Sequence, residues 1–348
     1  MSLLGKRIFM MGTAVAVVAA MSGCAAPAAN PAGGDNSAPS SSTAEKLVFK
    51  VGVHPCASDC GFLLMAQEKG FFDKYGVDVE YVDLKSAAQS LPALASGEVD
   101  AIEESPGGFF IASEKGDFDA SIIGSTMEGM PYAVYAKKEF SSLKDLEGKN
   151  LAISSPTGLP ALVAQLILED AGVDYSKMTL VNGGGNADRY KAVVAGTADA
   201  ASSPADYVPQ AEKDGVKVLA LSHDVVPNYP RYMIIANNDA LKKNDAATRY
   251  LAAMIEGVRY AYAHPDEAKA LAAKMMKTTA DDPIVTYMYD LIVKDQLFDK
   301  DQGISQKKLD FQEKVLRDVG QLTKPVPMDK LVDDSFQKAA LKMVKDKS

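Results

Sequence analysis

The chain has 348 residues, a length that favours two lobes of about 100–200 residues each. Hydrophobic residues make up 47% of it and charged residues 24%, which excludes wholesale disorder, collagen-like repeats and a membrane protein with many spans. The formal net charge is −9 and no basic stretch is present, so we expect no nucleic-acid partner, because binding phosphates requires clustered lysine and arginine.

The first 23 residues have the pattern of a secretory signal peptide. A basic pair, Lys6-Arg7, precedes an apolar run over 8–21, which is shorter than the ~20 residues that cross a hydrocarbon core. The run ends in MSGC, which resembles the bacterial lipobox and predicts cleavage before Cys24 and lipidation of its thiol. The alternative is an ordinary cleaved signal followed by a chance cysteine. Residues 24–46 are rich in Ala, Pro, Gly and Ser and predict a flexible tether. We therefore expect an extracytoplasmic protein held by lipid to a membrane, in the periplasm or on the outer face of the cytoplasmic membrane.

From residue 47 onward, apolar strands alternate with helices. The first half predicts strands at 47–53, 77–81, 99–102 and 121–125, and helices at 59–70, 86–97 and 106–115. The second half predicts strands at 151–153, 179–181, 198–201 and 216–221, and helices at 160–172, 187–196 and 204–213. From Asp245 onward the pattern predicts only helices.

This alternation predicts an α/β protein built from parallel units. Two extended segments, 131–136 and 232–236, connect the two series, so we expect two lobes with a cleft between them. The predicted division places 47–136 plus 237–348 in the first lobe and 137–236 in the second.

Five stretches then carry a family resemblance. In chain order they are VFKVGVHPCASDCGFLLMAQEKGFFDKYGVDVEYV, ALASGEVDAIEESPGGFF, LKDLEGKNLAISSPTG, YKAVVAGTADAASSPADY and YMIIANNDALKKN. They span about 46–266 and resemble periplasmic solute-binding proteins of the nitrate/taurine/alkanesulfonate group, which includes relatives that bind thiamine-pyrimidine precursors. The resemblance implies a two-lobed type II, venus-flytrap fold with a helical C-terminal tail. It also implies that the protein captures a small nutrient and delivers it to the permease of an ABC transporter.

In open α/β sheets, ligands bind where strand ends meet helix starts. The first lobe offers these candidate ligand-binding residues: His54, Ser58, Asp59, Phe62, Ser86, Gln89, Glu103, Glu104 and Ser105. The second lobe offers Ser155, Thr157, Gly158, Asn186, Arg189, Ser203, Asp206 and Tyr207. The chain has no Trp to stack on a ring, but Phe62, Phe109, Phe110, Tyr207 and Tyr232 can take that role.

Three features among these candidates indicate the ligand's chemistry. The segment 155–158, before a helix opened by Pro160, suits an anion, unless Ser155 or Thr157 only caps that helix. Arg189 can pair with a carboxylate or sulfonate, or it is a solvated helix residue. Of Glu103 and Glu104, adjacent in one strand, at most one should enter the cleft, where it would favour amine or amidine donors.

Cys56 and Cys60 lie in the first candidate loop. Outside the cytoplasm, two cysteines this close tend to oxidise, so we expect a disulfide that shapes the wall of the site. The alternative is a soft-metal site of His54, Cys56 and Cys60, with Met65 as a further ligand. The chain offers no second cluster of Cys and His to support that alternative.

The leading interpretation is a non-catalytic, monomeric solute-binding protein without a cofactor. Its ligand would be a nitrogen-bearing organic molecule, such as a pyrimidine precursor or an amino-sulfonate, and its partner an ABC permease. The rivals are a ligand sensor for a membrane receptor and a secreted enzyme on the same fold. The cysteine-rich motif of the related pyrimidine synthases is absent, as are Gly-x-Ser-x-Gly and His-Glu-x-x-His.

Overall fold

The computed structural model describes residues 46–84, 87–116, 118–156 and 158–347. The predicted signal peptide, the lipidation site Cys24 and the predicted tether up to residue 45 lie outside these residues, as do Ser86 and Thr157. Among the described residues, the structure has no helix with both the length and the apolar character needed to cross a membrane.

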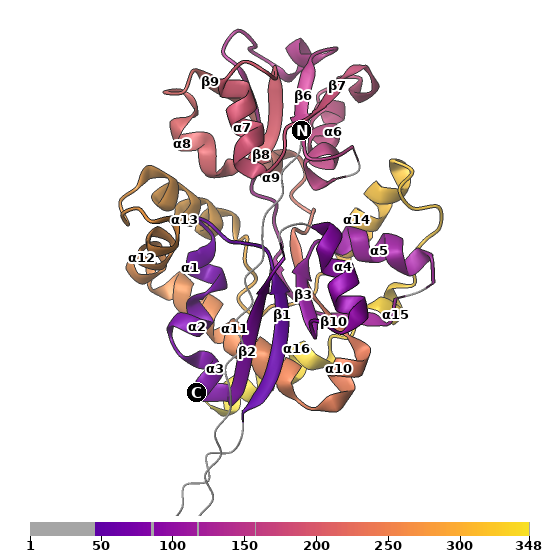
Figure 1. Cartoon of the computed structure of the whole chain (residues 1–348), viewed down its shortest axis with the longest axis vertical. Helices are drawn as coiled ribbons and strands as arrows, with labels where there is room; N and C mark the ends of the chain where they lie inside the picture. The colour runs from indigo at the N-terminus through magenta and orange to yellow at the C-terminus, as the bar shows by residue number, and fades with distance from the viewer. Residues whose placement is uncertain (1–45, 85–86, 117, 157, 348) are drawn as a thin grey trace, which may run out of the picture. The chain divides into compact units, whose positions relative to one another are not determined.

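The first sheet has the strand order β2-β1-β3-β10-β4 (Figure 1). Its strands are β1 (Leu47–Val53), β2 (Val77–Asp83), β3 (Ala101–Glu104), β4 (Ala120–Met127) and β10 (Tyr232–Asn237). Strands β1, β2 and β3 are parallel, whereas β10 runs antiparallel to both of its neighbours, β3 and β4. Strands β4 and β10 are buried along almost their whole length because helices cover both sides of them.

The second sheet repeats this arrangement with the order β7-β6-β8-β5-β9 (Figure 1). Its strands are β5 (Tyr132–Lys137), β6 (Asn150–Ile153), β7 (Thr179–Asn182), β8 (Ala200–Pro204) and β9 (Val216–Leu221). Here β6, β7 and β8 are parallel, and β5 runs antiparallel to β8 and β9.

The structure confirms the predicted α/β fold with two sheets. Parallel units were expected, but each sheet also contains an antiparallel strand. The difference arises from β5 and β10, which follow the two crossings and enter the other sheet in the reverse direction. Because β5 belongs to the second sheet and β10 to the first, the crossings lie before these strands, at 127–132 and 221–232. The expected boundaries at 136 and 236 lie instead near the far ends of the two strands.

Helices and 3₁₀ turns (η) fill the connections. Before β10 they are α1 (Cys60–Leu63), α2 (Met65–Glu68), α3 (Phe71–Tyr75), α4 (Ala87–Ser96), α5 (Pro106–Glu114), η1 (Leu143–Leu146), α6 (Leu159–Asp170), η2 (Tyr175–Lys177), α7 (Asn186–Val194), η3 (Ala205–Tyr207), α8 (Val208–Ala211) and α9 (Ser222–Val225). After β10 follow α10 (Asn238–Lys243), α11 (Ala246–Ala263), α12 (Pro265–Met276), α13 (Pro283–Asp295), α14 (Gln306–Asp318), α15 (Met328–Leu331) and α16 (Ser335–Asp346). The helical tail is confirmed, with two isolated β-bridges, to Phe298 and Val332, as additions. The helix expected over 59–70 is divided at Leu64 into α1 and α2.

Two glycines allow the helices after β1 to pack closely on the tail. A Cβ at Gly61 in α1 would lie 2.3 Å from the carbonyl oxygen of Ala268 in α12, and one at Gly257 in α11 would lie 2.6 Å from the backbone nitrogen of Ala66 in α2. Only glycine permits such close backbone approach. We call the first sheet with the helices packed on it the first lobe, and the second sheet with its helices the second lobe. The close packing fixes the loop after β1 at the carboxyl edge of the first sheet.

Candidate ligand-binding site

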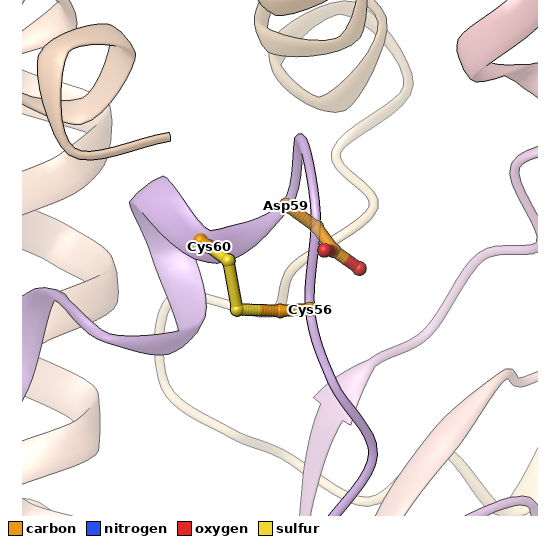
Figure 2. A group of neighbouring side chains, drawn as sticks. All are labelled: Cys56, Asp59 and Cys60. Carbon is orange, nitrogen blue, oxygen red and sulfur yellow. A yellow bond between two sulfur atoms is a disulfide. The ribbon is translucent and has the colours of Figure 1, made fainter. Parts of the chain in front are cut away.

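The loop after β1 is closed by a disulfide. Cys56 and Cys60 are bonded to each other with their Cα atoms 5.2 Å apart, which confirms the expected bridge (Figure 2). Asp59 projects from the same turn, and its carboxylate accepts a hydrogen bond of 2.9 Å from the backbone N–H of Ala57. The ligand atoms of Cys56, Asp59 and Cys60 lie within 4.8 Å of one another. Because both sulfurs are consumed by the disulfide, this group has no thiolate to offer a soft metal.

A cavity of about 90 Å³ lies between the two lobes, next to this loop. We call it the Asp206 cavity; its walls are Pro55, Ala57, Ser58, Asp59, Asn186, Pro204, Asp206, Tyr207, Arg231 and Met288. The Ser58 hydroxyl donates a hydrogen bond to the Asp206 carboxylate and so joins the first lobe to the second. Nη1 of Arg231, in the second crossing, lies 3.4 Å from Oδ2 of Asp59. The cavity thus brings together two carboxylates and one guanidinium.

The carboxylates set the electrostatics of the Asp206 cavity. Burial raises the pKa of Asp206, and the nearby charge of Asp59 adds to the rise, while the Ser58 hydrogen bond and Arg231 oppose it. Burial also raises the pKa of Tyr207 to about 12, so its hydroxyl remains neutral at physiological pH. A donor-rich or cationic ligand would relieve the repulsion between Asp59 and Asp206.

A second inter-lobe cavity, of about 170 Å³, has a different chemistry. We call it the Gly158 cavity; its walls are Leu91, Glu104, Ser105, Gly107, Gly108, Ile111, Gly158, Leu159, Leu162, Tyr229, Leu316 and Gln321. Helices α5 and α6 both begin at its wall, and most of the remaining wall is apolar. The expected anion-suited segment therefore contributes Gly158 to an inter-lobe cavity, whereas Ser155 is exposed and lines none of the cavities described here.

Glu103 and Glu104 face opposite sides of β3, as strand alternation predicts. Glu104 lines the Gly158 cavity and accepts a hydrogen bond of 2.8 Å from Nε2 of His54. Nδ1 of His54 lies 3.0 Å from the carbonyl oxygen of Leu84, so both ring nitrogens have acceptors, and the Glu104 contact raises the pKa of His54. Glu103 and His54 line a third cavity, of about 220 Å³, whose walls all belong to the first lobe.

Arg189 serves neither of its two expected roles. Its guanidinium is buried and donates to the carbonyl oxygens of Ser202 and Gly184, at 2.7 and 3.1 Å, and to Oδ1 of Asn186, at 2.8 Å. Ser203 is buried beside it and donates to the carbonyl oxygen of Asn186 at 2.6 Å. Arg189 thus fixes the loop before α7 to β8, and so places Asn186 at the Asp206 cavity. The Arg189 side chain is not solvated, because it lies buried between α7 and β8.

Other predicted site residues lie in the protein core or elsewhere on the surface. Phe62 is 1% exposed and packs against the rings of Tyr262, Tyr289 and Phe298, so it belongs to the core. Phe109 and Phe110 are also buried in the core. Gln89 borders a groove on the first lobe beside Asp83 and Pro92, away from both inter-lobe cavities. A helix residue that faces inward gives the same sequence pattern whether it contacts the protein core or a ligand.

Sequence reasoning missed Arg231 and Met288, which line the Asp206 cavity but lie outside the predicted loops at strand ends. Arg231 directly precedes the strand expected at 232–236. A positively charged residue in a segment that connects the two lobes could have indicated a position at the cleft. Its guanidinium lies 4.6 Å from the centre of the Tyr232 ring, an arrangement suited to a cation–π contact. Met288 of α13 gave no signal, because it lies in a helix of the tail that carries no motif.

Comparison with solved structures identifies the fold class of this chain. The chain superposes with a TM-score of 0.66 on the periplasmic aliphatic sulphonate-binding protein SsuA of Escherichia coli, at 18% identity, covering 82% of this chain and 92% of that one. It superposes with a TM-score of 0.63 on the desulfurization enzyme DSZB, at 14% identity, covering 86% and 99%. The fold is therefore that of the periplasmic binding proteins, a fold shared with an enzyme.

Comparison of the sequence with known families assigns the chain to one family. Residues 57–268, more than half of the chain, match the family described as NMT1/THI5 like. The chain belongs to this family. It is also 24% identical over 247 residues to a protein of Brucella abortus named as a binding protein, covering 69% of this chain and 75% of that one.

Proposed function

We propose that the chain is the extracytoplasmic solute-binding component of an ABC importer. It captures a small nitrogen-bearing organic nutrient between its lobes and delivers it to the permease. The observation that carries the proposal is the Asp206 cavity, where Asp59 of the first lobe and Asp206 of the second line one space between the lobes.

A ligand in this cavity acts on both lobes at once. A molecule that donates to Asp59 and Asp206 together stabilises the arrangement in which the lobes are in contact, by its differential affinity for that arrangement. A permease can then recognise the loaded form. This mechanism needs no bond to be made or broken, and we propose that the chain is not an enzyme.

The charges favour nitrogen over a simple anion as the recognised group. Two carboxylates and one guanidinium line the Asp206 cavity, and the guanidinium already faces Asp59. A ligand carrying an amine or amidine supplies the donors that the carboxylates lack. Helix starts, whose backbone N–H groups favour negative charge, lie instead at the Gly158 cavity, which shares no described wall residue with the Asp206 cavity.

The location remains part of the proposal. We propose that residues 1–23 are a signal peptide, that Cys24 is lipidated, and that the protein works as a monomer tethered to the membrane by 24–46. Mass spectrometry of the protein from membranes tests this directly: a diacyl or triacyl mass on a peptide beginning at Cys24 is expected, and an unmodified Cys24 would contradict it.

Thermal unfolding of the purified protein against a ligand panel tests the binding function. The panel contains aminopyrimidines, amino-sulfonates and simple amines, with nitrate and unsubstituted alkanesulfonates as the matched anions. A ligand at 100 times its dissociation constant stabilises the protein by about 2.7 kcal/mol, which raises the melting temperature by several degrees. Stabilisation by nitrogen-bearing compounds is the expected result, and stabilisation by the simple anions alone would contradict it.

The enzyme alternative is supported by the structural likeness to DSZB. Chemical analysis of the hit after incubation with the protein separates the two functions. Binding predicts that the compound is recovered unchanged, and a product formed in more than stoichiometric amount would show catalysis.

A further inference from the structure

A third cavity lies inside the first lobe, and the proposed transport function does not use it. Its volume of about 220 Å³ exceeds that of either inter-lobe cavity. Its walls come from β1, β2, β3, α1, α11, α12 and the loop that carries the disulfide. We call it the Glu103 cavity. It offers room for a ring of ordinary size, since one water needs only about 10–15 Å³ of such space.

The walls are apolar on several sides. Leu63, Leu64, Met254 and Met275 line the cavity, with Val53 at its β1 side. Met254 is 2% exposed, whereas Met275 is 46% exposed and lies at the rim. Methionine side chains adapt to irregular ligands and make favourable contacts with aromatic rings.

One carboxyl oxygen in this apolar wall, Oε1 of Glu103, lacks a hydrogen bond among the described residues. Glu103 is 7% exposed, and this oxygen is buried. Burial raises the pKa of this carboxyl to about 7, although an interaction with the Thr126 side chain lowers the pKa. A buried acceptor without a donor costs free energy, about 1–3 kcal/mol for a typical group. A ligand that donates to Oε1 would remove this cost.

The charged residues at the Glu103 cavity determine whether it favours a positively or a negatively charged ligand. Asp83 and Glu103 line it, and no lysine or arginine is among its walls in the described part of the chain. His54 also lines it and has a raised pKa, but its positive charge is paired with Glu104 on the other side of β3, which leaves Asp83 and Glu103 as the unpaired charges among the described wall residues. The surroundings therefore favour a positive over a negative ligand.

We propose that the Glu103 cavity binds a second ligand, a small organic cation whose apolar ring lies against Leu64, Met254 and Met275 and whose amidinium or ammonium group donates to Glu103. This site is separate from the one proposed for the transported nutrient. It is nevertheless adjacent to that site, because Pro55 lines both the Glu103 cavity and the Asp206 cavity. Occupancy of one cavity is thus in a position to alter the other.

Methionine methyl NMR with benzamidine as the probe tests the proposal. The intact protein is labelled on its methionine methyl groups and titrated with benzamidine, an amidinium on a single aromatic ring. Met254 and Met275 report on the Glu103 cavity, while Met288 reports on the Asp206 cavity. Single Met→Leu variants assign the three signals. The expected result is a saturable shift of the Met254 and Met275 signals.

Three variants sharpen the result. Glu103→Gln keeps the side chain's shape and should weaken benzamidine binding at least tenfold. Glu80→Gln, an exposed change on strand β2 of the same sheet, is the matched control and should leave the affinity unchanged. Met275→Lys places a cation at the exposed rim, where folding is not at risk, and should weaken binding as read from Met254.

The outcomes separate the two proposed sites. Shifts at Met254 and Met275 that depend on Glu103 and persist when the transported ligand is present support the second site. A shift of Met288 alone would show that benzamidine enters only the Asp206 cavity, and would overturn the second site while leaving the transport function intact. The absence of a saturable shift at Met254 and Met275, or equal affinity in Glu103→Gln, would also overturn it.

Discussion

The hydroxyl of Ser58, in the loop after β1, donates a hydrogen bond to the carboxylate of Asp206, in η3 directly after β8. The two residues are 148 positions apart in the chain and follow strands of different sheets. Their contact closes one side of the Asp206 cavity and gives the half-buried carboxylate a donor. It is therefore a link between the lobes at the place where we expect the ligand.

Removal of this donor should destabilise the protein. Ser58→Ala removes the hydroxyl partner of the half-buried Asp206 carboxylate, and we expect a loss of about 1–3 kcal/mol in the free energy of unfolding. Urea denaturation measures it. Ser176→Ala is the matched control, because Ser176 also donates to an aspartate but on the surface, and it should cost under about 0.5 kcal/mol. Equal losses in the two variants would show that the Ser58 contact has no special role.

The disulfide should contribute to stability mainly by constraining the unfolded chain. Cys56→Ala combined with Cys60→Ala opens a very short loop, for which chain entropy predicts a loss of about 2 kcal/mol. Urea denaturation with and without dithiothreitol measures it. The reductant should lower the stability of the wild type and leave that of the double variant unchanged. Alkylation of both cysteines in the unfolded, unreduced protein would contradict the bridge.

Glu103 should make stability fall as the pH rises. Its carboxyl has a pKa of about 7 in the folded protein, raised from the 4.5 of an unperturbed glutamate, mainly by burial. Between these values the folded state holds a proton that the unfolded state has released, so the free energy of unfolding decreases from about pH 4.5 to pH 7. The full shift corresponds to about 3 kcal/mol, taken as an upper bound.

Comparison with Glu103→Gln isolates this effect from other titrating groups. The difference in stability between wild type and variant should change by about 2–3 kcal/mol, in the direction that favours the variant, as the pH rises from 4.5 to 7. Glu80→Gln, on the surface of β2, should show no such trend. Urea denaturation at several pH values provides the data, and a pH-independent difference for Glu103→Gln would refute the prediction.

Arg189 should behave as a structural residue of the second lobe. Lysine cannot reproduce its three hydrogen bonds, so Arg189→Lys leaves buried acceptors without donors, and we expect a loss of about 2–4 kcal/mol in the free energy of unfolding. Arg259→Lys, an exposed arginine that also bonds a backbone carbonyl, is the control and should cost under about 1 kcal/mol. Unchanged stability in Arg189→Lys, with a selective loss of anion binding, would favour the ligand-binding role instead.

The alternation of apolar strands and helices predicted most of the fold, because each strand is covered by helices that carry their own stop signals. The direction of β5 and β10 could not be predicted from local pattern, since an apolar segment such as YMIIA reads the same whichever way it enters a sheet. The close packing of α1 on α12 likewise depends on backbone contact at Gly61. Such tertiary contacts leave no periodicity in the sequence.

The candidate site was predictable where it follows strand ends. Ser58, Asp59, Asn186, Asp206 and Tyr207 were all expected from that rule, and the structure brings them to one cavity. Arg189 was misjudged because the sequence shows a charge in a candidate loop but not the carbonyl oxygens that surround it. Phe62 was misjudged because an aromatic residue next to a ligand loop can equally face the core.

Isothermal titration calorimetry of the nitrogen-bearing compound selected by the melting panel tests the central claim most directly. The wild type is compared with Asp206→Asn, which keeps the shape of the side chain, and with Asp239→Asn, an exposed control. We predict one ligand per chain at the inter-lobe site, an affinity at least tenfold weaker in Asp206→Asn, and no change in Asp239→Asn. Equal affinity in all three proteins would show that the ligand is not held by the carboxylate between the lobes.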